Sequence, residues 1–441
     1  MTSSTEALST AGSAIAASSG AVRRIRTYRI PLRDRAWMGF HTVRAAGPIR
    51  TPSIDLVRRL LIKLWRTDPG HPLLCRIDVA HGRRHLTGAG DLDRYLSSVI
   101  IEAPGDVDAV DLARLLQAES PDGRPFMIAM SDHAAAMRSA HVIGDTATAN
   151  PWFFGLLKAG DPDRALAMIT AGPSSRFPVT AALINQFGRN PGGAIRALAR
   201  ALPLGPDGRP SSMIDTGVPE LINETAAPEL GVMLRRWRVR HAPRASVAAL
   251  WMAASIRALR TAGIDPGDGV FTMINSRRYL PAGASVRGNF AAGPYLVPDD
   301  LADPNSLGAE LAATTSAGVP LILLSAITAR SLFRLGRPAR IPQVAGGSPK
   351  IYLSHLGSIA DGDLDWDVTD RGSGARYVVA AEPAGPNAIT YVFANGPHGM
   401  HLSATAHQEC TDVAALRSAL HRVASDPIGL LEEDRPVTVR G

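Results

Sequence analysis

The sequence predicts an α+β protein that folds into two similar lobes. Strand patterns and helix patterns alternate along the chain, and the same kind of α+β unit occurs twice at low identity. The 441 residues are too many for one small core and suit two or three domains. We expect residues 1–22, rich in Ser, Ala and Thr, to be disordered, residues 23–205 to form the first lobe and residues 206–441 the second. The polar Gly/Pro stretch 204–212 is the expected linker.

Composition narrows the class of protein. With 45% hydrophobic and 20% charged residues, the chain is typical of a globular protein. Cys75 and Cys410 are its only cysteines, which excludes a disulfide framework and a thiolate metal site. The longest apolar run, 319–327, is shorter than the roughly 20 residues of a membrane span, and no basic segment precedes the apolar residues of the N-terminus. We therefore expect a cytoplasmic protein with no metal and no membrane span.

The charge argues against nucleic-acid binding. Net charge is +7, but the arginines are dispersed and aromatic residues make up only 5% of the chain. Lysine is nearly absent, at positions 63, 158 and 350 only. A guanidinium binds phosphate in bidentate fashion, so a coenzyme or carrier phosphate is the expected anionic partner.

The elements follow in order. The first half has strand patterns at 25–32, 37–45, 73–79 and 124–130, and helix patterns at 51–68, 107–116 and 134–141. The second half has helix patterns at 193–201, 246–262, 298–316 and 412–424, and strand patterns at 270–275, 351–353, 377–381, 388–393 and 400–406. The apolar segment 319–324 suits either type. We expect the last four strands to form one late sheet.

Four segments, in order over residues 25 to 425, resemble motifs of the CoA-dependent acyltransferase superfamily, which includes chloramphenicol acetyltransferase, peptide-synthetase condensation domains and polyketide-associated acyltransferases. The first is the helix 54–66 followed by the sequence HPLLCRI at 71–77. The second is the strand 124–130 running into Asp132-His133, where the family carries HHxxxD. The third is Arg277 after a strand, followed by Gly288-Asn289-Phe290, and the fourth is the SHLG sequence at 354–357.

The resemblance implies two chloramphenicol-acetyltransferase-like lobes with a tunnel between them. It assigns the general base to His133, because a neutral imidazole can take the proton of an attacking alcohol or amine. Arg277 would pair with the aspartate of the motif, Asn289 would support the tunnel wall, and Ser354 would cap a strand or donate to an oxyanion or phosphate. An acyl-CoA or phosphopantetheine thioester would be the co-substrate, with no tightly bound cofactor.

The motif is degenerate in this chain. Asp132 stands where the family has its first His, and Met137 stands where it has the Asp. Arg277 would then lack its carboxylate, unless Asp132 turns inward. A second register, His141 with Asp145, matches the HxxxD spacing, but it begins well beyond the end of the predicted strand. We expect this register to be the less favoured of the two.

Two functions follow. The first is an acyltransferase of natural-product or lipid biosynthesis, acting on a small-molecule acceptor, with an acyl or peptidyl carrier protein as a further partner. The second is a repurposed fold that catalyses a cyclisation or isomerisation, or only binds a biosynthetic intermediate. Because such a tunnel lies between lobes of one chain, a monomer is expected.

Overall fold

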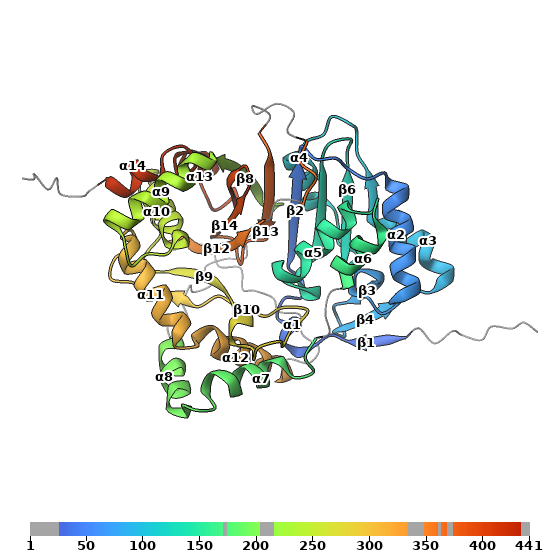
Figure 1. Cartoon of the computed structure of the whole chain (residues 1–441), viewed down its shortest axis with the longest axis horizontal. Helices are drawn as coiled ribbons and strands as arrows, with labels where there is room; N and C mark the ends of the chain where they lie inside the picture. The colour runs from blue at the N-terminus through green and yellow to red at the C-terminus, as the bar shows by residue number, and fades with distance from the viewer. Residues whose placement is uncertain are drawn as a thin grey trace, which may run out of the picture.

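Two α+β lobes lie side by side in the computed structural model (Figure 1). It describes residues 26–170, 174–202, 216–333, 348–359, 363–367 and 374–433. The predicted disordered segment 1–22, the linker 204–212 and the lobe boundary near 205 lie outside the described residues.

The first lobe is built on a five-stranded sheet of order β13-β2-β7-β6-β5. Its strands are β2 (His41–Gly47), β5 (Ile100–Glu102), β6 (Phe126–Met130), β7 (Ala135–Ala140) and β13 (Arg376–Ala381). A smaller sheet joins β1 (Thr27–Arg29), β4 (Arg83–Leu86) and β3 (Cys75–Asp78). The helices are α1 (Leu32–Arg35), α2 (Ile54–Thr67), α3 (Leu92–Val99), α4 (Ala109–Ala118), α5 (Thr146–Leu157) and α6 (Pro162–Thr170). Apolar residues of α4 cover one face of the large sheet, and those of α2, α3 and α5 cover the other.

The second lobe is built on the sheet β10-β9-β12-β14-β15-β8, with β11 also paired to β9. Its strands are β8 (Glu220–Ala226), β9 (Val270–Asn275), β10 (Ala291–Ala292), β11 (Tyr295–Leu296), β12 (Lys350–Ser358), β14 (Ala388–Gly396) and β15 (Gly399–Ala406). Its helices are α7 (Pro178–Phe187), α8 (Pro191–Ala201), α9 (Pro228–His241), α10 (Val247–Thr261), α11 (Pro304–Ser316), α12 (Val319–Phe333), α13 (Val413–Ser425) and α14 (Pro427–Glu432). Helices α9, α10, α13 and α14 bury one face of this sheet. Val392 and Ala394 of β14, on the other face, join the core of the first lobe.

Strand β13 ties the halves of the sequence together. It follows β12 in the chain, yet it pairs antiparallel with β2 of the first lobe (Figure 1), for example Tyr377 opposite Ala46. The prediction of a strand at 377–381 is confirmed, but its assignment to the sheet of the other late strands is wrong. A strand that crosses over in this way has no signature in its own sequence, because its partner lies more than 300 residues earlier.

One predicted element has the wrong type, and it bears on the site. Within the segment 134–141, predicted to be helical from its alanine content, residues 135–140 form β7, the central strand between β2 and β6. Every residue of β7 is buried, because α4 packs on one face and α5 lies over the other. Small side chains fit a strand that is covered on both faces, and this packing outweighs their helix propensity. The ambiguous segment 319–324 is helical and begins α12.

Among the described residues, no single helix is long and apolar enough to cross a bilayer. The bent pair α11 and α12, which meet at 56°, passes the same test by length and composition only.

Candidate functional site

The structure brings together a His, a carboxylate and an arginine where β7 leads into α5. His141 follows the last residue of β7 and begins a single 3₁₀ turn, and Asp145 caps the N-terminus of α5 by accepting from the Thr148 backbone N–H at 3.3 Å. The His141 N–H donates to the Phe40 carbonyl at 2.7 Å. Its ring stacks on Trp37, with centroids 4.2 Å apart and planes 12° from parallel. Backbone and ring contacts therefore both orient this imidazole.

Asp145 and Arg277 form a bidentate ion pair between the lobes. Arg277 donates from Nη1 to Oδ2 at 2.6 Å and from Nη2 to Oδ1 at 2.9 Å. The side chains are 10% and 20% exposed, so water screens the pair little. Oδ2 also accepts the Phe290 N–H at 2.9 Å, and Nη2 also donates to the Gly288 carbonyl at 2.9 Å. One carboxylate thus joins the start of α5 to two segments of the second lobe.

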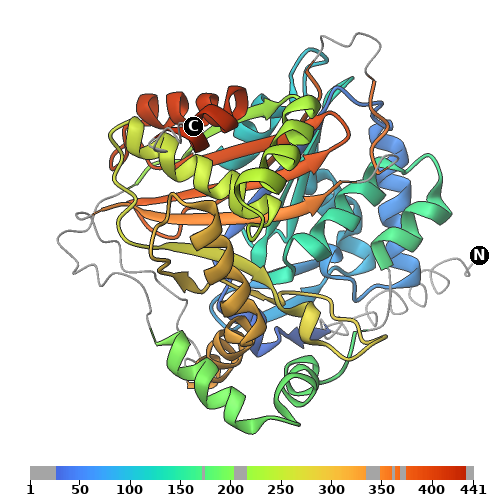
Figure 2. The same cartoon turned by 60° about the vertical axis from the view of Figure 1, so that its left-hand side comes forward.

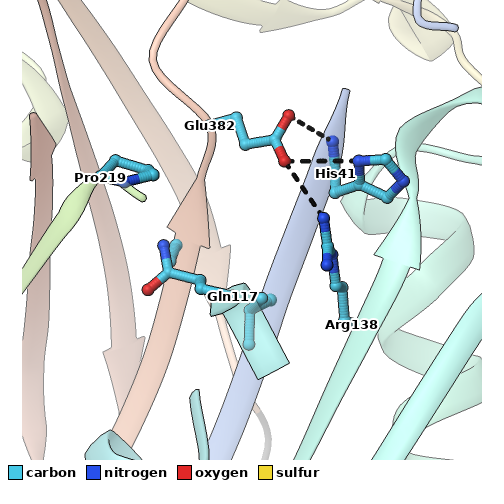
Figure 3. A pocket seen from close by; sticks show the side chains of 7 residues that line it. His41, Gln117, Arg138, Pro219 and Glu382 are labelled. Carbon is cyan, nitrogen blue, oxygen red and sulfur yellow. Dashed lines mark hydrogen bonds and ion pairs between the residues drawn. The ribbon is translucent and has the colours of Figure 1, made fainter. Parts of the chain in front are cut away.

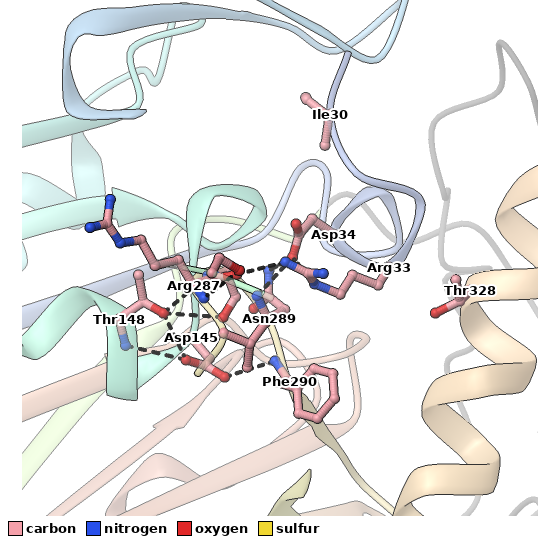
Figure 4. A network of polar contacts seen from close by, with 12 residues as sticks. Ile30, Arg33, Asp34, Asp145, Thr148, Arg287, Asn289, Phe290 and Thr328 are labelled. Atoms are coloured by element: carbon pink, nitrogen blue, oxygen red, sulfur yellow. Dashed lines mark hydrogen bonds and ion pairs between the residues drawn. The ribbon is translucent and has the colours of Figure 1, made fainter. Parts of the chain in front are cut away.

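Asn289 and Asp34 complete this interface (Figure 4). Asn289 Nδ2 donates to the His141 carbonyl at 2.8 Å and to Asp34 Oδ1 at 3.1 Å, and its backbone N–H donates to the same oxygen at 2.7 Å. Gly288, at φ +91°, lets the chain turn here, and a Cβ would lie 3.0 Å from both Asp34 oxygens. Burial raises the pKa of Asp34 to about 6, against the opposing effects of Arg33 and the Asn289 hydrogen bonds. The Gly288–Phe290 segment therefore clamps the His141–Asp145 loop.

The environment of His141 favours a neutral imidazole. Burial lowers its pKa below the usual 6.5, with Arg44 acting in the same direction, while the negative charge of Asp145 opposes the change. The Nδ1 atom is buried and has no partner from another described residue, whereas the residue as a whole keeps partial exposure. A neutral, oriented imidazole is what a general base requires.

Arg44, which is fully buried, braces the floor of this site. Its Nε donates to Asn150 Oδ1 of α5 at 2.8 Å, and its Nη1 donates to Ser139 Oγ of β7 at 2.9 Å. The Tyr377 hydroxyl of β13 donates to the same Asn150 oxygen at 3.1 Å. The brace therefore joins β2, β7, β13 and α5, the elements that flank the His141–Asp145 loop.

The first predicted register lies at the other end of β7. Asp132 and His133 occupy the turn between β6 and β7, where Asp132 is exposed and His133 is partly buried. The six residues of β7, at about 3.3 Å each, place this turn about 20 Å from His141. Met137 is buried in the middle of β7. The expectation that Arg277 lacks a carboxylate, or takes Asp132 as a substitute, is wrong, because Asp145 fills that position.

Ser354 lies on the second-lobe sheet. It alternates along β12 with the buried Leu353, so it shares a face with Tyr352, whose ring stacks on Phe271 of β9 at 4.6 Å. This half-buried face is the one turned away from the helices that cover the sheet. Within the described part of the chain, no hydrogen bond joins Ser354 to the His141–Asp145 loop.

A second cluster of ionisable groups lines a small pocket on the α4 side of the first sheet (Figure 3). Glu382 lies 3.3 Å from His41 Nδ1 and 3.5 Å from Arg138 Nη2, and it accepts the His41 backbone N–H at 3.1 Å. Arg138 also donates to two carbonyls at the C-terminal end of α4. Glu382 thus connects β2 and β7 to the residue after β13, and the contacts support a structural role for this pocket.

Sequence reasoning identified Arg277 and Asn289 but missed Asp34, Trp37 and Arg44. Nothing in the local sequence marks these three residues, because each acquires its role only through contacts with β7, α5 or the second lobe. His141 and Asp145 carried a signal in their HxxxD spacing, which the mistaken helix at 134–141 obscured. In the described ranges, no group of three or more His, Cys, Asp or Glu side chains could hold a metal ion.

Comparisons with known proteins relate the fold to solved structures. No family model matches the sequence, and no curated protein matches it. A trichothecene 15-O-acetyltransferase from Fusarium sporotrichioides has a TM-score of 0.64 at 12% identity, over 94% of this chain and 97% of that one. The first condensation domain of the CDA synthetase has a TM-score of 0.54 at 15% identity, over 93% and 98%. The epimerization domain from the third module of tyrocidine synthetase B has a TM-score of 0.52 at 14% identity, over 90% and 92%.

Proposed function

We propose that this chain, which has the two-lobed fold of the CoA-dependent acyltransferase superfamily, is an acyltransferase that moves an acyl group from a CoA or carrier-protein thioester to an alcohol or amine. One observation carries the proposal: the HxxxD residues His141 and Asp145 lie at the end of a central strand, and Arg277 of the second lobe binds the Asp. This is the arrangement that the family motif implies, in the second register rather than the first.

In this mechanism His141 takes the proton of the acceptor hydroxyl or amine as that group attacks the thioester carbonyl. The tetrahedral intermediate then expels the thiolate, which recovers the proton from the imidazolium. Asp145 and Arg277 do not touch the reacting atoms; they hold the loop that carries His141. Ser354 is the proposed oxyanion donor, since its face of β12 is turned away from the helices of the second lobe.

The acceptor class receives support from one structural neighbour. The trichothecene enzyme is an O-acetyltransferase by name, which supports an alcohol acceptor. The condensation domain among the neighbours supports a carrier-bound donor as an alternative to acyl-CoA. A role in natural-product or lipid biosynthesis is proposed on the same basis.

The test is a thiol-release assay on the full chain. Purified protein is incubated with a panel of acyl-CoA and carrier-protein thioesters and a set of alcohol and amine acceptors, and free thiol and product mass are both recorded. We expect acceptor-dependent thiol release with a product heavier by one acyl group. Thiol release that is independent of every acceptor, with no acylated product, contradicts the proposal.

A second candidate function is an isomerisation without acyl transfer. It rests on the departure of the motif, where Ala140 replaces the first His, and on the epimerization domain among the structural neighbours. In this case His141 would shuttle a proton on a bound substrate. An isomeric product of unchanged mass, formed without any thioester donor, supports this function; a strict requirement for the donor excludes it.

A further inference from the structure

Helix α8 has an inverted distribution of apolar side chains. Its small residues Ala197 and Ala201 are buried in a cluster with α12 residues. Its large residues Ile195, Leu198 and Leu202 lie at i, i+3 and i+7 and are 72%, 53% and 68% exposed. A surface helix of a globular protein normally buries its large apolar residues and exposes the small or polar ones.

Helix α7 extends the same surface. Phe177 at its N-cap and Ile184 two turns later are 64% and 66% exposed, while Ala182 and Phe187 pack inward. Together with the three residues of α8, these five exposed side chains are called the α7–α8 surface. The two helices form the lower edge of the molecule in both views (Figures 1 and 2). Large apolar side chains exposed on two contacting helices are typical of a binding surface.

The charge of this segment has one sign only. Residues 174–202 contain four arginines and no Asp or Glu. Arg176 lies over the Phe177 ring at 5.2 Å, and Arg200 pairs with Glu310 of α11. Arg189 and Arg196 are exposed beside the apolar side chains. The α7–α8 surface therefore combines protruding aliphatic groups with positive charge.

We propose that the α7–α8 surface docks the protein on an anionic lipid bilayer as a peripheral, non-spanning contact. Exposed Leu, Ile and Phe bordered by arginine are the composition of interfacial helices, whose apolar side chains enter the headgroup boundary. A second copy of the same face is disfavoured, because it would bring the exposed Arg189 and Arg196 of one copy close to the same positive charges of the other.

The experiment is vesicle co-sedimentation of the full chain. We expect binding to phosphatidylcholine vesicles that contain phosphatidylglycerol to exceed binding to phosphatidylcholine alone by at least about tenfold. The double variant Ile195→Glu/Leu198→Glu should lose this binding. Arg189→Ala and Arg196→Ala should each weaken it by about fivefold, the contribution of one cation near an anionic surface. The matched control is Val239→Glu, at a 67% exposed position of α9 away from this surface, which should bind as the wild type does.

Four results would overturn the proposal. The first is that the wild type fails to bind anionic vesicles, and the second is that it binds both vesicle types equally. The third is that the Ile195→Glu/Leu198→Glu variant still binds. The fourth is that light scattering shows a wild-type dimer that this variant converts to a monomer, which would assign the surface to a second copy. Circular dichroism and thermal unfolding of each variant ensure that a loss of binding does not come from a loss of fold.

Discussion

The carboxylate of Asp145 stabilises both the N-terminus of α5 and the contact between the lobes. It caps α5, within the first lobe, and it binds Arg277 and the Phe290 N–H of the second lobe. The loop between His141 and Asp145 has no room for a side chain at Gly144, where a Cβ would lie 2.7 Å from Thr148 Cβ. The position of the imidazole therefore depends on a contact between lobes.

Asp145→Asn is expected to destabilise the protein by about 3 kcal/mol, because it leaves the Arg277 guanidinium largely buried without its charge partner. Urea unfolding measures the change. The matched control is Asp111→Asn, which removes the partner of Arg114 from an exposed pair with side chains 46% and 61% exposed. That variant should lose less than about 1 kcal/mol. Equal losses of unfolding free energy in the two variants would show that the Asp145–Arg277 pair contributes no more stability than an exposed ion pair.

The lowered pKa of His141 predicts the pH dependence of activity. A general base works only when neutral, so a folded pKa below the usual value keeps the base active to more acid pH. We expect the acid limb of the kcat/KM profile to have its midpoint below pH 6.5. A midpoint above 6.5 contradicts the burial of this ring as the dominant influence.

At the scale of elements, the part of the site that the sequence does not predict lies at β7. Its flanks were predictable: β6 ends at Met130 as expected, and Arg277 and Asn289 follow β9 as the motif order indicates. Half of the residues of β7 are alanines, whose intrinsic preference is helical. A helix predicted over this strand puts the strand end at His133, and the HxxxD spacing at His141 then lies too far along the chain.

The short helix α1 carries the buried carboxyl group of Asp34, whose pKa predicts how stability depends on pH. Burial raises the pKa of Asp34 to about 6 from 3.8, so the folded state binds its proton more readily than the unfolded state. The stability contributed by protonated Asp34 is full below pH 3.8 and is lost as the pH rises through 6. Between pH 4 and 7, the wild type should lose about 3 kcal/mol of stability relative to Asp34→Asn. Denaturation of both proteins across this range measures it, and parallel pH profiles would refute the assignment.

At the scale of the whole molecule, the halves of the sequence are interleaved. Strand β13 enters the first sheet, the Gly288–Phe290 segment clamps the first-lobe loop, and β14 residues complete the first-lobe core. These ties connect segments 140 to 340 residues apart in the sequence, which explains why no local pattern reveals them. The positive charge, by contrast, is spread along the chain, and residues 174–202 are one of the segments that contain arginines but no carboxylate.

The core of the first lobe makes the molecule acid-sensitive. Burial lowers the pKa of His71 to about 3, and the ring lies buried between the Leu73 N–H and the Ile169 carbonyl. Because the folded pKa lies below the unfolded 6.5, stability is full above pH 6.5 and is lost as the pH falls toward 3. We expect protonation of His71 to lower the free energy of unfolding by about 4 kcal/mol between pH 6.5 and pH 3. The free energy of unfolding, measured from pH 7.5 to 4 for the wild type and His71→Gln, should fall less steeply in the variant. Equal slopes contradict the assignment.

The central claim is that the end of β7, and not its beginning, carries the base. The most direct measurement compares thiol-release turnover of His141→Ala and His133→Ala, prepared and assayed side by side with the same donor and acceptor. We expect His141→Ala to lose about 10²- to 10⁴-fold in kcat, the contribution of a general base, and His133→Ala to stay within about tenfold of wild type. The reverse order of losses, or a loss of less than tenfold in His141→Ala, would contradict the account.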